Sequence, residues 1–443
     1  MIKFFEKYFD LSGNRTTVRR EFLAGLITFL TMSYILIVNP SILATTGMNQ
    51  EALFTATALA TIVATLLMAF LAKLPIAQAP GMGLNAFFAF TICGAMGYSW
   101  QFALTAVFIE GIIFILLTFF NVRELIVKSI PLVLRNAIPV GIGLFITLIG
   151  LKNAGIVVGS EATLLQIGDL SQHSVWIAIF GLLVTAVLYI RNVNGAILIG
   201  IILSTVFGFI LDWDTVVLPE SVVSLPPSIA PIFAKFEWDQ VLSFDMLIAV
   251  FTLLFVNLFD TVGTLIGVVS KAGLADENGN FPQMKKALFA DAVGTTVGAV
   301  LGTSTITSYV ESASGVASGG RTGLTSVSTA LLFILALFFA PLFLMVPMAA
   351  TSPALIIVGL FMISAVAKID FNNMTDGLPA FLTVVFMPFT YSIAEGIVFG
   401  MLSYMLIKLC SGKHKEVSVT VYVISGLFLL KLVLEASGVI GGH

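Results

Sequence analysis

Runs of about twenty apolar residues with few charges recur along the whole chain, and they constrain the fold more than any other feature. A helix in the bilayer core satisfies its own backbone hydrogen bonds, so such runs predict membrane-spanning helices. Only 10% of the 443 residues are charged and 58% are apolar, whereas about a quarter are charged in a soluble domain. The composition therefore excludes a soluble enzyme, a disordered protein and a nucleic-acid binder, and predicts an all-α polytopic protein of the lipid bilayer.

The apolar runs predict fourteen transmembrane segments, with 213–243 as a polar extracytoplasmic connector between two halves. The expected segments are 22–38, 52–72, 76–97, 102–120, 131–151, 174–190, 196–212, 244–268, 286–302, 303–318, 323–344, 351–367, 378–393 and 395–410. With a cytoplasmic N-terminus, eighteen of the 21 Lys and Arg residues fall at cytoplasmic ends, as the positive-inside rule requires. The run at 417–436 is predicted either to span once more or to lie against the membrane.

The two halves resemble each other at three places that follow in the same order. Ala52-Leu53-Phe54 matches Ala287-Leu288-Phe289, Phe114-Ile115-Leu116 matches Phe333-Ile334-Leu335, and Gly143-Leu144-Phe145 matches Gly359-Leu360-Phe361. Because each repeat has an odd number of spans, we predict two seven-span repeats of inverted topology, as in many secondary transporters. The expected domains are the first repeat at 1–212, the connector at 213–243, the second repeat at 244–410 and a C-terminal tail at 411–443.

Two segments at matching places in the repeats cannot be regular spanning helices. The third contains Pro80, Gly81 and Gly83, which break a helix. The tenth, 303–315, is too polar and too rich in β-favouring residues to face lipid. Both are predicted to be short extended pieces that lead into half-helices. Such backbone occurs at membrane depth only where it is buried in protein or lines a cavity, so we expect a polar solute to bind between the two.

Carboxylates inside the membrane are candidates for function because they are costly to bury. Glu311 lies in the second irregular segment, and Asp260 lies in the middle of the eighth span. Asn257, Asp260 and Thr264 share one helical face. We therefore predict that Glu311 and Asp260 recognise a solute and carry H+.

Three further carboxylates are predicted to have mainly structural roles. Gly294, Gly298 and Gly302 follow Asp291 at four-residue spacing, so this helix is expected to be a packing surface with Asp291 near a lipid or loop boundary. Glu110 and Glu395 lie near span ends or beside glycines.

Several kinds of site are not expected in this chain. All three histidines (His173, His414 and His443) fall in loops or tails, so any proton has to be carried by a carboxylate. Cys93 and Cys410 form neither a disulfide framework nor a metal-ligand pattern. No GxxxxGK[ST], HExxH or GxSxG motif occurs. We therefore expect no cofactor and no enzymatic activity.

Five segments resemble the AzgA-like purine permeases of the nucleobase–ascorbate transporter (NCS2) superfamily, and the resemblance extends over about residues 15–415. The segments are Asn39-Pro40, APGMGLNAFFAF from Ala79, NLFDTVGTLIGV from Asn257, TSYVESASGVASGGRTGLT from Thr307 and SPALIIVGL from Ser352. The resemblance implies proton-coupled, alternating-access import of purine bases across a bacterial inner membrane, most like that of adenine permeases, often by a homodimer. It also implies a core of spans 1–4 and 8–11 (about 20–120 and 244–344) and a gate of spans 5–7 and 12–14 (about 131–212 and 351–410).

Carried onto this sequence, the resemblance places the base between the two irregular segments. The implied substrate-binding residues are Asn85, Ala86, Asp260, Thr264, Val310 and Glu311, with Asn257 and Asp291 as second-tier candidates. Phe87 and Phe259 are added to the predicted site because the flat face of a purine suits aromatic side chains. Thr264 stands where some relatives have His, and Asn257 where many have Asp. These departures leave open which carboxylate carries the proton, whether H+ or Na+ is coupled, and whether adenine, guanine or hypoxanthine is preferred.

The competing hypothesis is a channel or an anion exchanger built on the related fold. A selective anion path needs a cation or a site made only of half-helix ends. The two irregular segments instead carry a carboxylate and an amide, without Lys or Arg, so this hypothesis is the less favoured.

Overall fold

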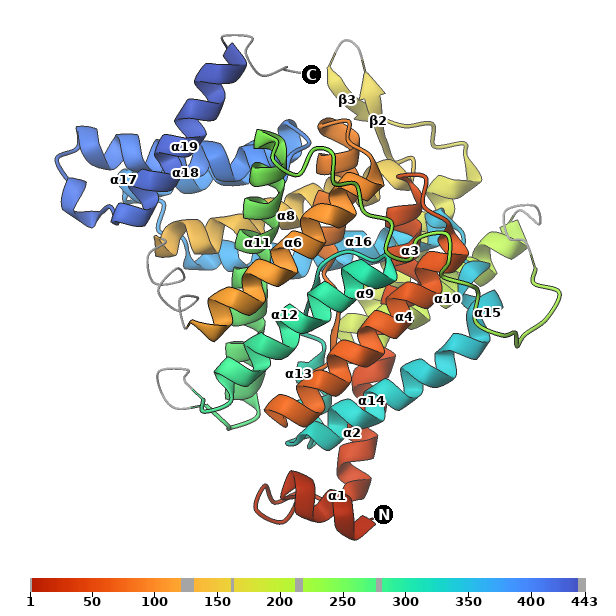
Figure 1. Cartoon of the computed structure of the whole chain (residues 1–443). Coiled ribbons are helices and arrows are strands. Elements are labelled where there is room, and N and C mark those ends of the chain that lie inside the picture. The colour runs from red at the N-terminus through yellow and green to blue at the C-terminus, as the bar shows by residue number, and fades with distance from the viewer. Residues whose placement is uncertain (1, 121–130, 161–162, 212–217, 276–280, 437–443) are drawn as a thin grey trace.

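The computed structural model describes residues 2–120, 131–160, 163–211, 218–275 and 281–436, which are mostly helical (Figure 1). Nine helices among them are long and apolar enough to cross a membrane. These are Val18–Ala44, Gln50–Ala72, Trp100–Phe119, Leu132–Asn153, His173–Ile190, Phe244–Lys271, Gly323–Leu344, Met348–Lys368 and Ile393–Cys410. Shorter apolar helices lie at Met82–Ala95, Ala196–Leu211, Met374–Phe389 and Val419–Leu430. The chain is a polytopic helical membrane protein, and the count of fourteen spans stays a prediction.

A first group of helices, drawn from both halves of the chain, packs mainly within itself. It contains α2 (Val18–Met32), α3 (Ile35–Ala44), α4 (Gln50–Leu67), α6 (Trp100–Phe119), α11 (Phe244–Lys271), α12 (Met284–Leu301) and α14 (Gly323–Ala336). α4 packs against α12 and α14, and these three run side by side in Figure 1. α6 packs against α11 and α12, while α2 packs against α14. Helices of the two halves therefore interleave in this group. The two irregular segments, 76–97 and 303–318, pack mainly on α4, α6 and α2 and are counted with it.

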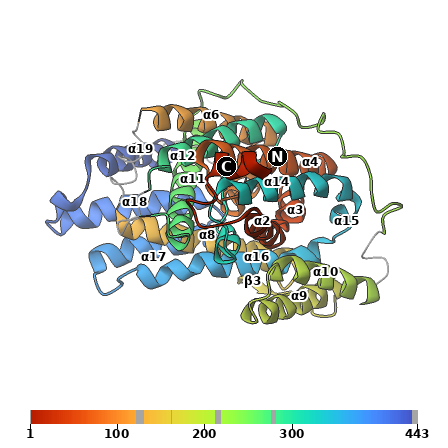
Figure 2. The ribbon, with the colours of Figure 1, turned by 90° about the horizontal axis from the view of Figure 1, so that it is seen from below.

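A second group forms a separate layer. It contains α8 (Leu132–Asn153), α9 (His173–Ile190), α10 (Ala196–Leu211), α16 (Met348–Ile363), α17 (Met374–Phe389) and α18 (Ile393–Cys410). α16 packs along α8 and α9, and α17 packs on α8 and α18 (Figure 2). Gly143 and Gly359, which the repeat comparison aligns, allow α8 and α16 to approach closely. A Cβ on Gly143 would lie only 2.6 Å from the Gly359 carbonyl oxygen.

Both predicted irregular segments contain a short strand followed by a short helix, so this expectation is confirmed. In the first segment, β1 (Gln78–Pro80) is followed by α5 (Met82–Ala86) and a π-helical stretch, Phe87–Ala95. In the second, β4 (Ile306–Ser308) is followed by α13 (Ser312–Ala317). The two strands pair antiparallel, with Gln78 opposite Ser308 and Pro80 opposite Ile306. This pairing satisfies backbone groups that a lipid-facing strand would leave without partners.

The first span, expected to be continuous over 22–38, is interrupted instead. α2 ends at Met32 and α3 begins at Ile35, with Ser33 and Tyr34 between them. The interruption places Tyr34 beside the second irregular segment, where its hydroxyl donates a hydrogen bond to Glu311.

The C-terminal run predicted at 417–436 forms α19 (Val419–Ala436), which packs against α18. Phe428 of α19 also meets Phe251 of α11 in an edge-to-face contact, with 5.6 Å between ring centroids. The helix therefore contacts both helix groups. The remaining elements are α1 (Ile2–Phe9), the hairpin β2 (Val157–Ser160) and β3 (Leu164–Ile167), α15 (Ala340–Leu344) and short helical turns at Met68–Ala72, Leu337–Phe339, Ser364–Lys368 and His414–Glu416.

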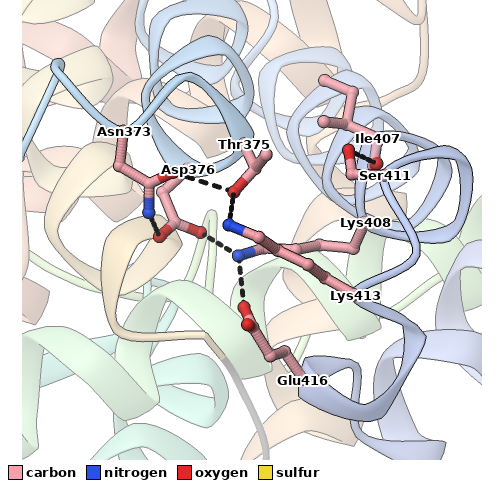
Figure 3. Close-up of polar contacts among 8 residues, drawn as sticks. All are labelled: Asn373, Thr375, Asp376, Ile407, Lys408, Ser411, Lys413 and Glu416. Atoms are coloured by element: carbon pink, nitrogen blue, oxygen red, sulfur yellow. Dashed lines mark hydrogen bonds and ion pairs between the residues drawn. The ribbon is translucent and has the colours of Figure 1, made fainter.

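A buried lysine joins the tail to the second helix group (Figure 3). The side chain of Lys408 is only 1% exposed, and its ammonium group lies 2.9 Å from Asp376 and 2.6 Å from Glu416. The hydrogen bond from Lys408 holds the pKa of the exposed Glu416 below its usual range. Two carboxylates thus compensate the buried charge, which alone would be strongly unfavourable.

Candidate functional site

A cavity of about 90 Å³, which we name the central cavity, lies between the two helix groups. The residues of the first group that line it are Tyr34, Gly81, Met82, Gly83, Asp260, Thr264 and 307–311. The residues of the second group that line it all belong to α16 and are Val358, Phe361 and Met362. Pockets for small molecules usually measure about 300–1,000 Å³. The central cavity is thus smaller than a usual binding pocket, and separation of α16 from the first group would enlarge it.

Glu311 reaches the central cavity from the turn between β4 and α13. The hydroxyl of Tyr34 donates a hydrogen bond to Oε1 of Glu311 at 2.6 Å. The backbone N–H of Tyr309 donates to the Ala77 carbonyl at 3.0 Å, and its hydroxyl donates to the Pro80 carbonyl at 2.6 Å. These bonds to the first irregular segment hold the turn in place. Val310 is 54% exposed, so the chain on the N-terminal side of Glu311 faces open space.

Asp260 provides a second carboxylate from the middle of α11. Its Oδ2 accepts a hydrogen bond from the hydroxyl of Thr307 at 3.2 Å, and Thr307 is the central residue of β4. Thr264, one helical turn further along α11, also lines the cavity. The structure thus brings together four of the predicted site residues: Asp260, Thr264, Val310 and Glu311.

The other four predicted contact residues do not line the central cavity. Asn85 is completely buried, and its side-chain oxygen accepts a hydrogen bond from the Ser304 hydroxyl. Its amide nitrogen lies 3.8 Å from the sulfur of Met82, which does line the cavity. Ala86 and Phe87 are also buried in the apolar core. Phe259 packs on Phe255, with 4.8 Å between ring centroids. In this structure these four side chains lie outside the lining of the central cavity, and their contact with a substrate stays a prediction.

Asn257 of α11 and Glu110 of α6 form a buried polar layer beside β4. The amide of Asn257 donates to Oε1 of Glu110 at 3.0 Å, and the hydroxyl of Thr305 donates to Oε2 at 2.6 Å. All three side chains are completely buried. Glu110 thus holds β4 against α11, in agreement with the structural role expected for it.

Asp291 lies in the protein interior, which corrects its predicted place near a lipid or loop boundary. It is completely buried, and its Oδ1 accepts hydrogen bonds from Thr261 at 2.9 Å and from Gln78 at 3.2 Å. The reason is that α12 is packed between α4 and α6. The expected packing surface on α12 is confirmed, since a Cβ on Gly294 would lie 2.8 Å from the Cβ of Ala64.

The histidines and cysteines lie away from the central cavity where the structure describes them. His173 begins α9, and His414 begins the helical turn that follows α18, while His443 lies outside the described residues. Cys93 and Cys410 are free thiols. Among the residues described, no group of three His, Cys, Asp or Glu side chains could hold a metal ion.

Sequence reasoning missed Tyr34 and the three residues of α16. Tyr34 belongs to a run that reads as one apolar helix, and the sequence shows no breaker beside Ser33. Val358, Phe361 and Met362 are ordinary apolar residues of a predicted span. Only the packing of α16 across the irregular segments identifies them as part of a cavity wall.

Comparisons with known proteins show the family of the chain. Residues 19–399 match the family model described as the permease family, Xan_ur_permease. Adenine permease AdeQ of Escherichia coli (strain K12) is 45% identical, over 97% of this chain and 96% of that protein. Guanine/hypoxanthine permease PbuG of Bacillus subtilis (strain 168) is also 45% identical, over 96% of this chain and 98% of that protein.

One solved structure with the same fold is the transmembrane domain of a cyanobacterium bicarbonate transporter, BicA. It has a TM-score of 0.65 and covers 85% of this chain and 97% of that chain. The sequences are only 16% identical, so this similarity concerns the fold alone.

Proposed function

Because the chain belongs to the NCS2 family of nucleobase permeases, we propose that it imports purine nucleobases by proton symport, with adenine favoured over guanine or hypoxanthine. It is a transporter and not an enzyme. The observation that carries the proposal is the pair of carboxylates, Glu311 and Asp260, that face one cavity between the two helix groups.

The chemistry of the central cavity suits a purine. A purine offers ring N–H donors, ring nitrogen acceptors and a flat face, and binding sites match such ligands with a few placed polar groups in apolar surroundings. Glu311 and Asp260 supply acceptors, while Phe361 and Met362 supply apolar surface. Among the described residues that line the cavity, none is His, Lys or Arg. The proposed proton carrier is therefore one of the two carboxylates.

We propose that the two halves are inverted seven-span repeats. The order α4, β1, α5 in the first half recurs as α12, β4, α13 in the second. The antiparallel pairing of β1 with β4 and the mutual contact of Gly143 with Gly359 support this relation. Transporters of this kind bind their substrate near the membrane midplane, where the repeats meet.

In the proposed mechanism, the first helix group is the core and the second is the gate. Rocking of one group against the other would expose the central cavity to each side in turn. The proposed divisions follow the predicted repeats, 1–212 and 244–410, with 213–243 as the connector and 411–443 as the tail. We place the protein in the inner membrane with its N-terminus in the cytoplasm, as the distribution of Lys and Arg favours, and propose a homodimer on the resemblance alone.

A channel or an anion exchanger is the less favoured alternative. The fold shared with a bicarbonate transporter permits it, but the central cavity presents carboxylates and no described Lys or Arg. A carrier exchanges substrate across the membrane, so external unlabelled adenine should drive exit of radiolabelled adenine from loaded vesicles. A channel would show no such counterflow.

Uptake by the purified protein in proteoliposomes tests the proposal. Radiolabelled adenine should accumulate when an inward proton gradient is imposed, and a sodium gradient should not replace it. Competition by unlabelled adenine, guanine, hypoxanthine, xanthine and uracil would rank the substrates. Failure of every purine to compete, with the protein monodisperse, would reject the proposed function.

A further inference from the structure

A second and larger cavity lies next to the central one. This cavity, which we name the inner cavity, has a volume of about 280 Å³. Its polar wall includes Thr31 of α2, Asn192 and Asn194 of the loop between α9 and α10, Lys271 at the end of α11, and Ser314 of α13. Water and a polar solute can thus be accommodated on this side of the site.

Two residues line both cavities. Glu311 and Phe361 appear in the walls of the central and the inner cavity alike. Glu311 belongs to the first helix group and Phe361 to α16 of the second. A single carboxylate and a single aromatic ring, one from each group, therefore form the boundary between the two cavities.

Phe361 is held by its own helix group. Its ring lies 4.8 Å from the ring of Tyr189 at the end of α9. Movement of α16 relative to the first group would therefore shift Phe361 against Glu311.

Near Lys152, aromatic packing joins the two groups. The ring of Tyr391 lies 5.2 Å from that of Phe145 on α8 and 6.1 Å from that of Phe90 in the first group. The ammonium group of Lys152 lies 5.0 Å from the Tyr391 ring centroid. Lys152 lies in the last turn of α8 and Asn192 follows α9, the next long helix of the chain, so the two lie at opposite ends of consecutive spans. The inner cavity therefore adjoins the central cavity on the side of Asn192, away from Lys152.

We propose that the inner cavity is the exit chamber for the transported base and its proton, and that Phe361 is the gate that separates this chamber from the central cavity. The amides of Asn192 and Asn194 provide hydrogen bonds for a heteroaromatic base that leaves the site, and Lys271 places a cation in the chamber that Glu311 borders. The identity of the solute rests on the proposed function, whereas the role of Phe361 as a gate between the two cavities does not depend on which solute is transported.

Thiol labelling in a background without Cys93 and Cys410 tests the gate, and it needs no substrate. Ser314→Cys reports on the inner cavity and Thr264→Cys on the central cavity. A membrane-impermeant maleimide should label Ser314→Cys only from the membrane face that carries Lys271. In Phe361→Ala, labelling of Thr264→Cys from that face should accelerate about two- to tenfold, the change expected from loss of one aromatic pair.

Phe386→Ala is the matched control, because Phe386 forms an aromatic pair with Phe399 elsewhere in the second group, and it should leave the labelling rate unchanged. If Phe361→Ala is not monodisperse, Tyr189→Ala removes the partner ring and should give the same acceleration. Equal labelling rates in a folded gate variant and its parent would overturn the proposal, as would labelling of Ser314→Cys from the other face. Absence of purine uptake by the parent would instead reject the proposed function and leave the gate result standing.

Discussion

The two irregular segments share one plan, a short strand followed by a short helix, but they differ in what their side chains face. In the first, Asn85 and Phe87 are completely buried, and the residues that line the central cavity, Gly81, Met82 and Gly83, carry no charged or polar side chain. In the second, Val310 is 54% exposed and Glu311 borders both cavities. The comparison shows that corresponding segments of the two halves can take different roles. The first segment supports the structure, and the second carries the acidic group at the cavity.

The hydrogen bonds between the segments support this division. The backbone N–H of Gly81 donates to the Thr305 carbonyl at 3.0 Å. The hydroxyl of Ser312 accepts from the backbone N–H of Ala77 at 3.0 Å. A Cβ on Gly81 would lie 2.6 Å from Cγ2 of Thr307, so only glycine allows this approach. The first segment therefore positions the second, which carries the acidic group.

The largest effect is expected for Glu311→Gln, which tests whether the second irregular segment forms the substrate site. Glutamine keeps the size and an acceptor oxygen but cannot carry a proton, so gradient-driven accumulation should disappear. Affinity for adenine should fall about tenfold, because a charge-assisted hydrogen bond becomes a neutral one. Proteoliposome uptake and equilibrium binding measure the two effects.

Glu220→Gln is the matched control, since Glu220 is exposed in the connector, and it should behave as the parent protein. Normal accumulation by Glu311→Gln at equal protein content would remove the second segment from the site.

Asp260→Asn should also impair transport strongly, because Asp260 is the second carboxylate of the central cavity. Uptake should fall at least about tenfold, as a hydrogen bond to a charged group contributes about 1.5–3 kcal/mol. Exchange of adenine that survives in each carboxylate variant should be measured as a function of pH. The variant that loses its pH dependence identifies the proton carrier, and retention of that dependence in both would contradict a carboxylate carrier.

Asn85→Ala tests whether the first irregular segment has a structural role and does not bind the substrate through Asn85. Removal of the amide leaves the buried hydroxyl of Ser304 without this acceptor, so the free energy of unfolding should fall by about 1–3 kcal/mol. Adenine affinity should change by less than about threefold, because Asn85 does not line the central cavity. Thermal unfolding and binding of the purified variant separate the two roles. A large loss of affinity without a loss of stability would return Asn85 to the binding site.

The smallest effect is expected when His173, His414 and His443 are replaced together. None of the three belongs to either irregular segment, so pH-dependent uptake should stay within experimental error of the parent. Loss of proton coupling in this variant would mean that the carboxylates are not sufficient as carriers.

Much of the architecture could be predicted because apolar runs and helix breakers act locally. Pro80 and its neighbouring glycines predict the first irregular segment, and the polar run that begins at Thr303 predicts the second. Glu311 and Asp260 could be predicted as site residues because a carboxylate within a span is costly unless it is used.

The directions of side chains could not be predicted from the same patterns. Asn85 was expected to contact the base, yet its side-chain oxygen accepts a hydrogen bond from Ser304 in the protein interior. Asp291 appeared to be near a boundary because its helix is rich in glycine, yet close packing of α12 buries it. Tyr34 and Phe361 join the site only through contacts between distant segments, which no local pattern encodes.

Protection of a single cysteine by substrate tests most directly the claim that the second segment forms the purine site. Val310→Cys, in the background without Cys93 and Cys410, should react with a small thiol reagent, and adenine should slow this reaction with the same concentration dependence as its binding. Val222→Cys in the exposed connector is the matched control and should react at one rate with or without adenine. Adenine that binds to the Val310→Cys protein without slowing its labelling would contradict the account.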